Sequence, residues 1–385
     1  MRIHFNNADK AGCGFFRCYL PAMLLRELGH TCTVDFPGSP ASLANEEEIS
    51  IFQRHFSPQV QRIITQKKLI GIKVGFELDD NLWDIAKDNP AYAAYSTEAV
   101  IKREYQYNLE HPDDKKTFLR PLTAMKDFIR VSDFVTVSTA PLAKRLERFN
   151  KKIFVLPNGI IPAGYLEPLG PMHTVRIGWH GSMHHMNDLK PAAYALTQIM
   201  RERPNVILVI MGWMHPMFSA KEFEGRIEYY PWFKEPQMHI IRSAMIPLHI
   251  GLAPLEPNAF NISKSNLKLL EYGASTVCPI AQDIYPYSTT INNMKEGLLV
   301  KRHDEKLWKE AIEWAIDHPT ERADMAKRLR DLVHEKFHAK VTIKKYEETY
   351  EKVLKMKPNK KTWERVWHVE ESQGIKDACV RELVS

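Results

Sequence analysis

Short apolar runs alternate with amphipathic stretches from the first residues of the chain. In the first part they indicate strands at 1–6, 31–36, 49–53, 72–78, 133–138 and 152–157, and residues 15–30 have the spacing of a helix with one apolar face. Strands that alternate with helices are typical of a parallel sheet covered by helices on both faces. The pattern therefore predicts an α/β domain over residues 1–160.

A second domain follows a break in this pattern. Residues 157–174 are rich in Gly and Pro and show no periodicity. The alternation restarts with apolar runs at 175–180, 205–212, 226–230, 248–254 and 276–281. We expect a second α/β domain over residues 174–340, and C-terminal helices over 341–385 that could pack back on the first domain.

Composition narrows the class of protein. The chain has 385 residues, of which 44% are hydrophobic and 26% charged, as in ordinary globular proteins. Five cysteines without a CxxC pair argue against a disulfide framework or a structural zinc site. No apolar run approaches the ~18 residues of a membrane span, and no signal peptide is apparent, so we expect a cytoplasmic protein. The net charge of +6 permits an anionic partner.

In open parallel sheets, ligands bind beyond the carboxyl ends of the strands. After the first strand, Gly12 and Gly14 would let the backbone approach an anion, which makes Gly14 a candidate for donor binding, and Arg17 could reach an acceptor. The glycines partly resemble a dinucleotide fingerprint, but Arg17 stands where the third glycine belongs. A nicotinamide-dependent dehydrogenase is therefore disfavoured.

Paired acids follow the strand at 72–78. Asp79 or Asp80 could orient a hydroxyl or act as a general base, and Trp83 could contact the acceptor. The alternative is a turn in which these acids cap a helix. Nothing nearby completes a metal site.

The second domain opens with a loop suited to a diphosphate. Gly181 and Ser182 follow the strand at 175–180 and precede a helix, with His180 as a neighbouring donor. The histidines at 180, 184 and 185 lack the HEXXH spacing, so we expect no metal. Ordinary polar loop residues are the alternative.

Residues 260–274 are expected to form a helix directly after a strand. Lys264, Lys268 and Glu271 would share one stripe, and Ser263 or Ser265 would cap the N-terminus. The helix dipole and Lys264 would then hold a phosphate, while Glu271 would accept hydrogen bonds from ribose hydroxyls. A solvated charged helix face is the alternative.

Several segments together resemble a known family. The stretches 155–160, 176–189, 248–274 and 296–300 are similar in order and spacing to nucleotide-sugar glycosyltransferases of the GT-B fold, especially relatives of glycosyltransferase family four. This resemblance covers most of residues 1–340 and is strongest in the second domain. It implies two Rossmann-like domains that face a cleft, a basic residue on the donor diphosphate, matched by Lys264, and a glutamate on the ribose, matched by Glu271.

The chain departs from the family in three places. Residues 77–80 stand where many relatives have a strand end that carries a histidine near the reacting sugar, so the acceptor-side chemistry is left open. Ser263 stands where the first glutamate of the E-x7-E motif is expected, which leaves the donor sugar open. His249 replaces an aspartate that many relatives carry before the run at 251–255. The resemblance otherwise implies a UDP-linked donor, retention of configuration and no metal or tightly bound cofactor, with Lys264 stabilising the leaving group.

The acceptor is the most open question. Residues 12–37 resemble glycosyltransferases of bacteriophage genomes, some of which modify hydroxymethylated pyrimidines in DNA, and such an enzyme would act in the host cytoplasm. The basic and aromatic stretches 226–234 and 360–368 have residue types that could contact double-stranded DNA. A polysaccharide, glycolipid or protein acceptor is the alternative within this class, and a noncatalytic nucleotide- or DNA-binding protein is the alternative outside it.

Overall fold

The computed structural model describes residues 1–10, 12–162, 167–170, 172–231 and 245–363. The chain forms two compact units. Unit 1 comprises Met1–Pro157 and Ile343–Ser385, and unit 2 comprises Asn158–Thr342. The polypeptide therefore passes from unit 1 into unit 2 and returns.

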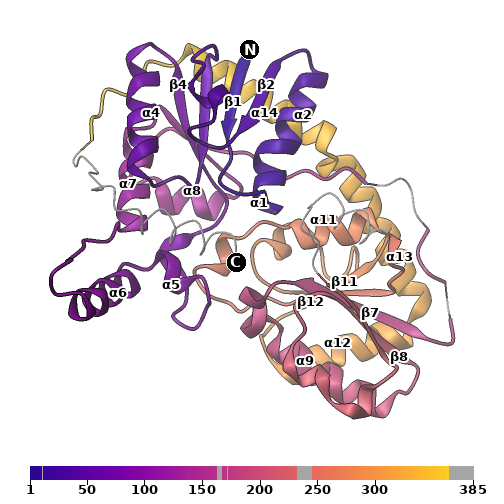
Figure 1. Cartoon of the computed structure of the whole chain (residues 1–385). Coiled ribbons are helices and arrows are strands. Elements are labelled where there is room, and N and C mark those ends of the chain that lie inside the picture. Colours follow the sequence, from indigo (N-terminus) through magenta and orange to yellow (C-terminus); the bar gives the residue numbers. More distant parts are fainter. Residues whose placement is uncertain (11, 163–166, 171, 232–244, 364–385) are drawn as a thin grey trace. The chain divides into compact units, whose positions relative to one another are not determined.

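Unit 1 is built on a six-stranded parallel sheet with the strand order β2-β1-β3-β4-β5-β6 (Figure 1). The strands are β1 (Arg2–Asn6), β2 (Thr31–Asp35), β3 (Ile49–Gln53), β4 (Lys73–Leu78), β5 (Phe134–Val137) and β6 (Ile153–Val155). The helices are α1 (Gly12–Gly14), α2 (Leu20–Glu27), α3 (Pro40–Leu43), α4 (Pro58–Leu69), α5 (Tyr92–Tyr95), α6 (Thr97–Glu110), α7 (Pro121–Val131) and α8 (Ala140–Leu146), with a π-helical turn at Phe15–Tyr19.

The last described helix, α14 (Ala339–Lys355), completes unit 1 although it follows unit 2 in sequence. Tyr350 of α14 packs edge-on against Phe5 of β1 and Phe134 of β5, and is 1% exposed. Nε2 of His30 lies 2.7 Å from a carboxylate oxygen of Glu347. Apolar residues from both ends of the chain therefore share one core.

Unit 2 repeats the same architecture with the strand order β12-β11-β10-β7-β8-β9, all parallel. Its strands are β7 (Val175–Gly181), β8 (Val206–Gly212), β9 (Ile227–Tyr230), β10 (Ile250–Ala253), β11 (Cys278–Gln282) and β12 (Leu298–Val300). Its helices are α9 (Met186–Glu202), α11 (Leu267–Ala274), α12 (Glu305–Asp317) and α13 (Pro319–Leu332), followed by a π-helical turn at Val333–Phe337.

The sheet of unit 2 is covered on both faces. One core joins strand residues such as Ile177 to α9 and α12, through Leu196 and Trp308. A second core joins strand residues such as Val209 to α11, through Leu270. Since both faces are buried, the strands are nearly continuous apolar runs, which is how they were recognised in the sequence.

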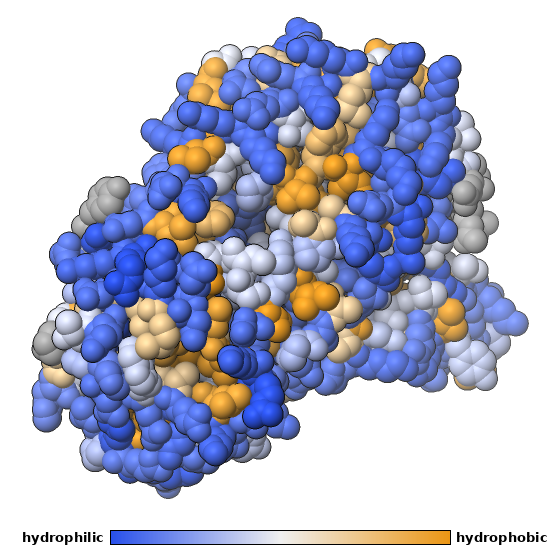
Figure 2. Space-filling model, turned by 180° about the vertical axis from the view of Figure 1, so that it is seen from behind, coloured by the Kyte–Doolittle hydropathy of each residue, from blue (hydrophilic) through white to orange (hydrophobic). Residues whose placement is uncertain are grey.

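The predicted α/β fold with two parallel sheets is confirmed. Each predicted strand is present with ends that differ by at most two residues, and β12 is the strand that the apolar pattern did not indicate. Among the described residues, no helix is long and apolar enough to cross a bilayer. On the face shown in Figure 2, hydrophilic residues predominate and hydrophobic residues form small separate groups.

Candidate functional site

The carboxyl end of β7 leads directly into an anion-binding geometry in unit 2. His180 and Gly181 end the strand, and one 3-10 turn at Met183–His185 connects them to α9. A Cβ atom on Gly181 would lie 2.6 Å from the Trp179 ring, so a larger residue would have to displace either the loop or that ring. The first amides of a 17-residue helix therefore follow a strand end without a side-chain cap.

The predicted helix at 260–274 begins later than expected. Asn261–Ser263 form a 3-10 turn, Lys264 is extended (φ −67°, ψ 162°), and α11 starts only at Leu267 after Asn266. The hydroxyl of Ser263 donates to the carbonyl of Ala259 at 3.2 Å. The expectation that Ser263 or Ser265 caps this helix, and that Lys264 lies within it, is wrong: Asn266 occupies the N-cap position.

Lys268 and Glu271 do lie on α11, where they meet the end of β7. Lys268 donates from Nζ to the carbonyl oxygen of His180, and Nδ1 of His180 lies 3.4 Å from Oε2 of Glu271. Burial lowers the pKa of Lys268 and raises that of Glu271, although each charge favours the ionised form of the other. The structure thus brings together three of the predicted donor-binding residues.

Asp188 fixes the loop between β10 and α11. Its carboxylate accepts hydrogen bonds from the side chain of Asn261 at 2.6 Å and the backbone amide of Glu256 at 2.9 Å. The other carboxylate oxygen lies 2.7 Å from Nδ1 of His185. The start of α9 and the loop that carries Lys264 are therefore held together by one buried acid.

Lys264 lies close to the start of α9. Its Nζ sits 4.3 Å from the centroid of the Phe260 ring. Burial lowers the pKa of His185 to about 4, against the hydrogen bond that Asp188 accepts from it, and the charges of Lys264 and Lys268 lower it further. The amides of α9 and the charge of Lys264 could bind an anionic group beside a neutral His185, although the carboxylate of Asp188 offsets part of that charge.

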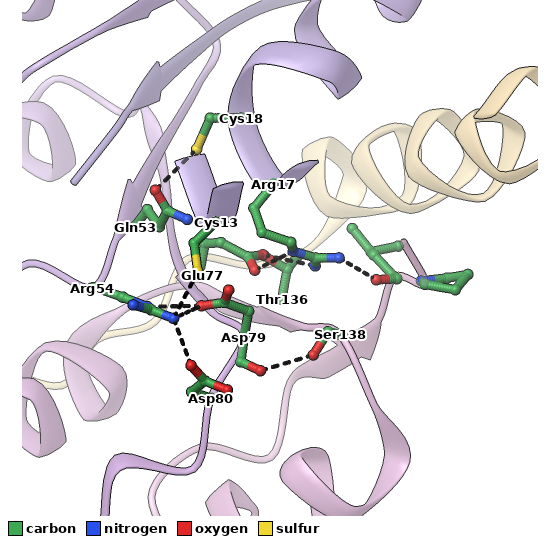
Figure 3. A network of polar contacts seen from close by, with 12 residues as sticks. Cys13, Arg17, Cys18, Gln53, Arg54, Glu77, Asp79, Asp80, Thr136 and Ser138 are labelled. Atoms are coloured by element: carbon green, nitrogen blue, oxygen red, sulfur yellow. Dashed lines mark hydrogen bonds and ion pairs between the residues drawn. The ribbon is translucent and has the colours of Figure 1, made fainter. Parts of the chain in front are cut away.

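In unit 1, Arg17 is enclosed and not available to an acceptor. The side chain is 1% exposed. Nε donates to Glu77 at 2.7 Å and Nη1 donates to the carbonyl of Leu156 at 2.6 Å. Glu77 also accepts from the hydroxyl of Thr136. The predicted acceptor contact of Arg17 is corrected by this geometry, because the guanidinium is committed to the core of unit 1 (Figure 3).

Asp79 and Asp80 follow β4, as the sequence indicated, but they share a cation. Nη2 of Arg54 lies close to three groups: the Cys13 thiol (3.2 Å), Asp79 (2.6 Å) and Asp80 (2.9 Å) (Figure 3). The ligand atoms of Cys13, Asp79 and Asp80 lie within 4.8 Å of one another, a spacing that a metal ion could also use, and the guanidinium of Arg54 is directed at all three. Although burial opposes its charge, the acids raise the pKa of Arg54.

The remaining predicted residues of unit 1 have local structural contacts. A Cβ atom on Gly14 would lie 2.0 Å from the carbonyl oxygen of Asp9 and 2.4 Å from Oδ1 of Asn7, so this glycine is required by its own loop. Trp83 packs against Phe149 with ring centroids 5.6 Å apart. In unit 2, Oγ of Ser182 lies 3.1 Å from Nδ1 of His184.

Two residues of the site were missed in the sequence. Asp188 lies within a stretch that was already singled out, and its spacing of three from His185 on a helix was the available signal. Arg54 gave no signal, since it follows β3 and meets the acids that follow β4 only through the parallel pairing of these strands. Of the basic and aromatic stretches, residues 232–234 and 364–368 lie outside the described residues.

The sequence matches no protein-family model and no curated protein. Solved structures are similar in fold. HepE from Anabaena, in complex with UDP and glucose, has a TM-score of 0.62 at 12% identity over 91% of this chain and 100% of that chain. Sucrose-phosphate synthase from Thermosynechococcus elongatus has a TM-score of 0.63 at 12% identity over 92% of this chain and 99% of that chain.

A third similar structure is a TarM mutant from S. aureus, in complex with UDP and other ligands. Its TM-score is 0.55 at 15% identity, over 78% of this chain, which spans 55% of the TarM chain. These neighbours are glycosyltransferases of the GT-B fold. Together with the two six-stranded parallel sheets, they show that this chain has the GT-B fold.

Proposed function

We propose that this protein is a glycosyltransferase that moves a sugar from a UDP-linked donor to a hydroxyl group, and that the acceptor is a hydroxymethylated pyrimidine in DNA. The observation that carries the proposal is the arrangement in unit 2 of Lys264, the start of α9 and the His180–Glu271 pair. HepE, which shares the fold, is described in complex with UDP-glucose. The net charge of +6 supports an anionic acceptor.

The chemistry of the transfer assigns roles to these side chains. The bond between the anomeric carbon and the diphosphate breaks, and a bond from the acceptor oxygen to that carbon forms. Negative charge develops on the leaving diphosphate, where Lys264 and the amides of α9 would stabilise it. The carboxylate of Glu271, oriented by His180, would accept hydrogen bonds from the ribose hydroxyls.

The stereochemical part of the proposal is retention by attack on the front face of the sugar. The acceptor hydroxyl would give its proton to the departing phosphate oxygen, so that no covalent enzyme intermediate is needed. Lys264 and the helix amides supply the positive charge, and a metal ion has no assigned role. Asp79 and Asp80 stay candidates for the acceptor side, but Arg54 would have to release a carboxylate before it could accept a proton.

The test is a panel of nucleotide sugars with release of nucleoside diphosphate as the readout. We expect release from a UDP-sugar that is stimulated by DNA containing hydroxymethylated pyrimidines. Stimulation by a polysaccharide, a glycolipid or a protein, and not by DNA, would show that the acceptor belongs to that class of molecule. Binding of UDP without release under every condition would indicate a noncatalytic nucleotide-binding protein.

A further inference from the structure

Residues 356–363, here called the C-terminal segment, lie beside the amino ends of β4, β5 and β6, where Lys73, Asp133 and Lys152 contact its backbone. The amide of Asn359 donates to Asp133, which precedes β5, at 2.6 Å. The side-chain amide of Asn359 donates to the carbonyl oxygen of Ser132 at 2.8 Å. Trp363 packs edge-on against Phe128 and donates from Nε1 to Thr65. The segment is therefore fixed to unit 1 at both of its ends.

Cations from the surrounding elements hold the backbone of this segment. Their donors and carbonyl acceptors are Lys68 to Asn359 (3.0 Å), Lys73 to Met356 (2.5 Å), Lys152 to Lys357 (2.8 Å) and Arg130 to Thr362 (2.7 Å). A carbonyl oxygen is a neutral acceptor, so these contacts satisfy hydrogen bonds without cancelling charge. Burial lowers the pKa of Lys68. The charge of Asp133 acts in the opposite direction, and the charge of Lys152 lowers the pKa further.

Further lysines surround the same place and are exposed. They are Lys151, Lys352, Lys355, Lys357, Lys360 and Lys361. Lys352 lies over the ring of Phe154 in β6, and Lys151 adjoins Lys152. We call these six lysines, with Lys68, Arg130 and Lys152, the basic surface. Lys73 is buried and is not part of it.

Few acids offset this charge. Two buried acids offset part of it: Asp127 lies 4.0 Å from Nε of Arg130, and the charge of Asp133 acts on Lys68. Glu351 is the exposed acid within residues 351–363. At the neighbouring start of β3, Glu47 is paired with Lys67 and Glu48 with Arg2. Since like charges at this spacing repel one another, an anionic partner would stabilise the basic surface.

The position of the basic surface selects a large partner. Lys73 begins β4, whereas Asp79 follows its carboxyl end. A six-residue strand is about 20 Å long, so the basic surface and the acceptor-side residues lie at opposite ends of the strands of one sheet. A nucleotide or a single phosphate cannot contact both the basic surface and the acceptor-side residues, but a polymer of phosphates can.

We propose that the basic surface binds the phosphate backbone of duplex DNA, apart from the site of chemistry, and retains the polymer while its bases are modified. This inference rests on the proposed DNA acceptor and adds the surface that would hold it. Lysine contacts to phosphates release counterions, so binding is independent of sequence and weakens steeply with salt.

An anionic lipid surface is the competing partner. Leu69 and Ile70 are 81% and 58% exposed beside Lys68 and could insert into lipid. Stable interfacial anchoring usually requires a broad apolar helix face. The apolar residues of α4, including Val60, Ile63 and Ile64, are instead buried in unit 1. The cations of the basic surface thus outnumber the exposed apolar side chains that could insert into a bilayer, which favours DNA over lipid as the partner.

The experiment measures binding of the full-length protein to an unmodified 30-base-pair duplex by fluorescence anisotropy over a range of salt. The test variant is Lys360→Glu with Lys361→Glu. The matched control is Lys344→Glu with Lys345→Glu, two exposed lysines on α14 outside the basic surface. Both variants lower the net charge equally, and thermal melting confirms that each is folded.

We expect the test variant to bind at least about tenfold more weakly than wild type and to show a shallower dependence on salt, by roughly one unit in log Kd against log salt for each lost contact. The control should change affinity by less than about twofold. Equal losses of affinity in both variants would mean that DNA binding depends on the net charge alone, and would overturn the assignment of the basic surface as the DNA-binding site. Failure of wild type to bind DNA, with binding to phosphatidylglycerol vesicles that the test variant loses, would assign the surface to lipid.

The two proposals fail separately. Because the duplex carries no hydroxymethyl group, its binding does not depend on transfer. Binding through the basic surface with no DNA-stimulated release of nucleoside diphosphate would retain this inference and remove the acceptor. DNA-stimulated release that is identical in wild type and the test variant, over the whole range of salt, would retain DNA as the acceptor and overturn the role of the basic surface.

Discussion

Lys264 and Lys268 are four residues apart but lie in different surroundings. Lys264 is partly exposed above the Phe260 ring. Lys268 is directed inward, where it donates to His180 and lies 5.7 Å from the centroid of the Trp179 ring. We therefore assign Lys264 to the incoming diphosphate and Lys268 to the support of the site around Glu271.

The first prediction concerns Lys264. Replacing it with alanine removes one positive group from the leaving diphosphate, and we expect kcat to fall by about 10²- to 10³-fold. Release of nucleoside diphosphate measures the change. Lys306→Ala, at an exposed lysine on α12, is the matched control and should retain wild-type turnover. Unchanged turnover in Lys264→Ala would remove the donor diphosphate from this loop.

The second prediction concerns the pH dependence of stability at His249. Burial lowers its pKa to about 4, and nearby Arg322 contributes. The unfolded state then binds more protons than the folded state between about pH 4 and 6.5, so stability falls as the pH falls through this window. We expect His249 to lower the free energy of unfolding by about 2 kcal/mol when the pH falls from 7 to 5.

His249→Asn tests this, because the asparagine oxygen can accept the amide of Arg176 as Nδ1 of His249 does, at 3.0 Å. The loss in melting temperature between pH 7 and pH 5 should be smaller in the variant than in wild type. His55 and His185 shift in the same direction and remain in both proteins. An equal loss in both would show that folding does not lower the pKa of His249.

At the scale of single residues, the sequence indicates which residue types could form the site, but it indicates less well which residues they contact in the folded chain. Lys268, Glu271 and His180 were recognised as donor-site candidates, and they are in contact. Arg17 was misjudged because its partner Glu77 is 60 residues away in sequence. Periodicity shows which side of a helix faces inward, but not that a buried charge is matched on another strand.

At the scale of elements, the loop from β10 to α11 depends on α9. Asp188 in the first turn of α9 accepts hydrogen bonds from two groups of this loop and lies beside His185. Burial opposes the charge of Asp188, but its hydrogen bonds with His185 and the backbone amide of Glu256 lower its pKa overall, so the carboxylate is charged at neutral pH. The loop that carries Lys264 is thereby positioned by a helix that is distant in sequence.

The third prediction follows from this anchor. Asp188→Ala removes the acceptor of the backbone N–H of Glu256 and one of the two acceptors of the Asn261 side-chain amide, and we expect a loss on the order of 2 kcal/mol of stability. The KM for the donor should also rise, because Lys264 is no longer held near α9. Asp188→Asn retains one acceptor oxygen and should show a smaller effect in urea unfolding and donor titration. A stability loss with an unchanged KM would limit Asp188 to folding.

The strands were predictable because both faces of each sheet are buried, which makes their sequences continuously apolar. The start of α11 was not. Its N-terminal turn is 3-10 and stops at Ser263, Lys264 is extended, and the helix restarts at Leu267, although all of these residues are compatible with a helix. The contacts of Asp188 with the preceding loop, including that to Asn261, override the local preference.

At the scale of the whole molecule, unit 1 depends on a helix from the far end of the chain. The fourth prediction is that Tyr350→Ala destabilises unit 1 by about 4 kcal/mol, because a buried aromatic ring between Phe5 and Phe134 is lost. Thermal melting measures this. Tyr350→Phe keeps the ring and should lose much less, and Tyr105→Ala, at a residue 66% exposed, should lose less than about 0.5 kcal/mol. A minor effect of Tyr350→Ala would show that α14 is dispensable for unit 1.

The division into two α/β domains was readable from the sequence because residues 157–174 interrupt the alternation of strands and helices. The return of the chain at Ile343 was expected in outline only. An amphipathic helix such as α14 shows that it has an apolar face, but the identity of the sheet that covers this face is a property of the folded chain.

The return of α14 has a consequence for biosynthesis. After Pro157 leaves the ribosome, all of unit 2 must be translated before α14 emerges, which takes on the order of 10 to 40 s at typical bacterial elongation rates. During this interval the nascent unit 1 cannot bury Phe5 and Phe134 beneath Tyr350. The unit whose synthesis starts first is thus the last to be completed.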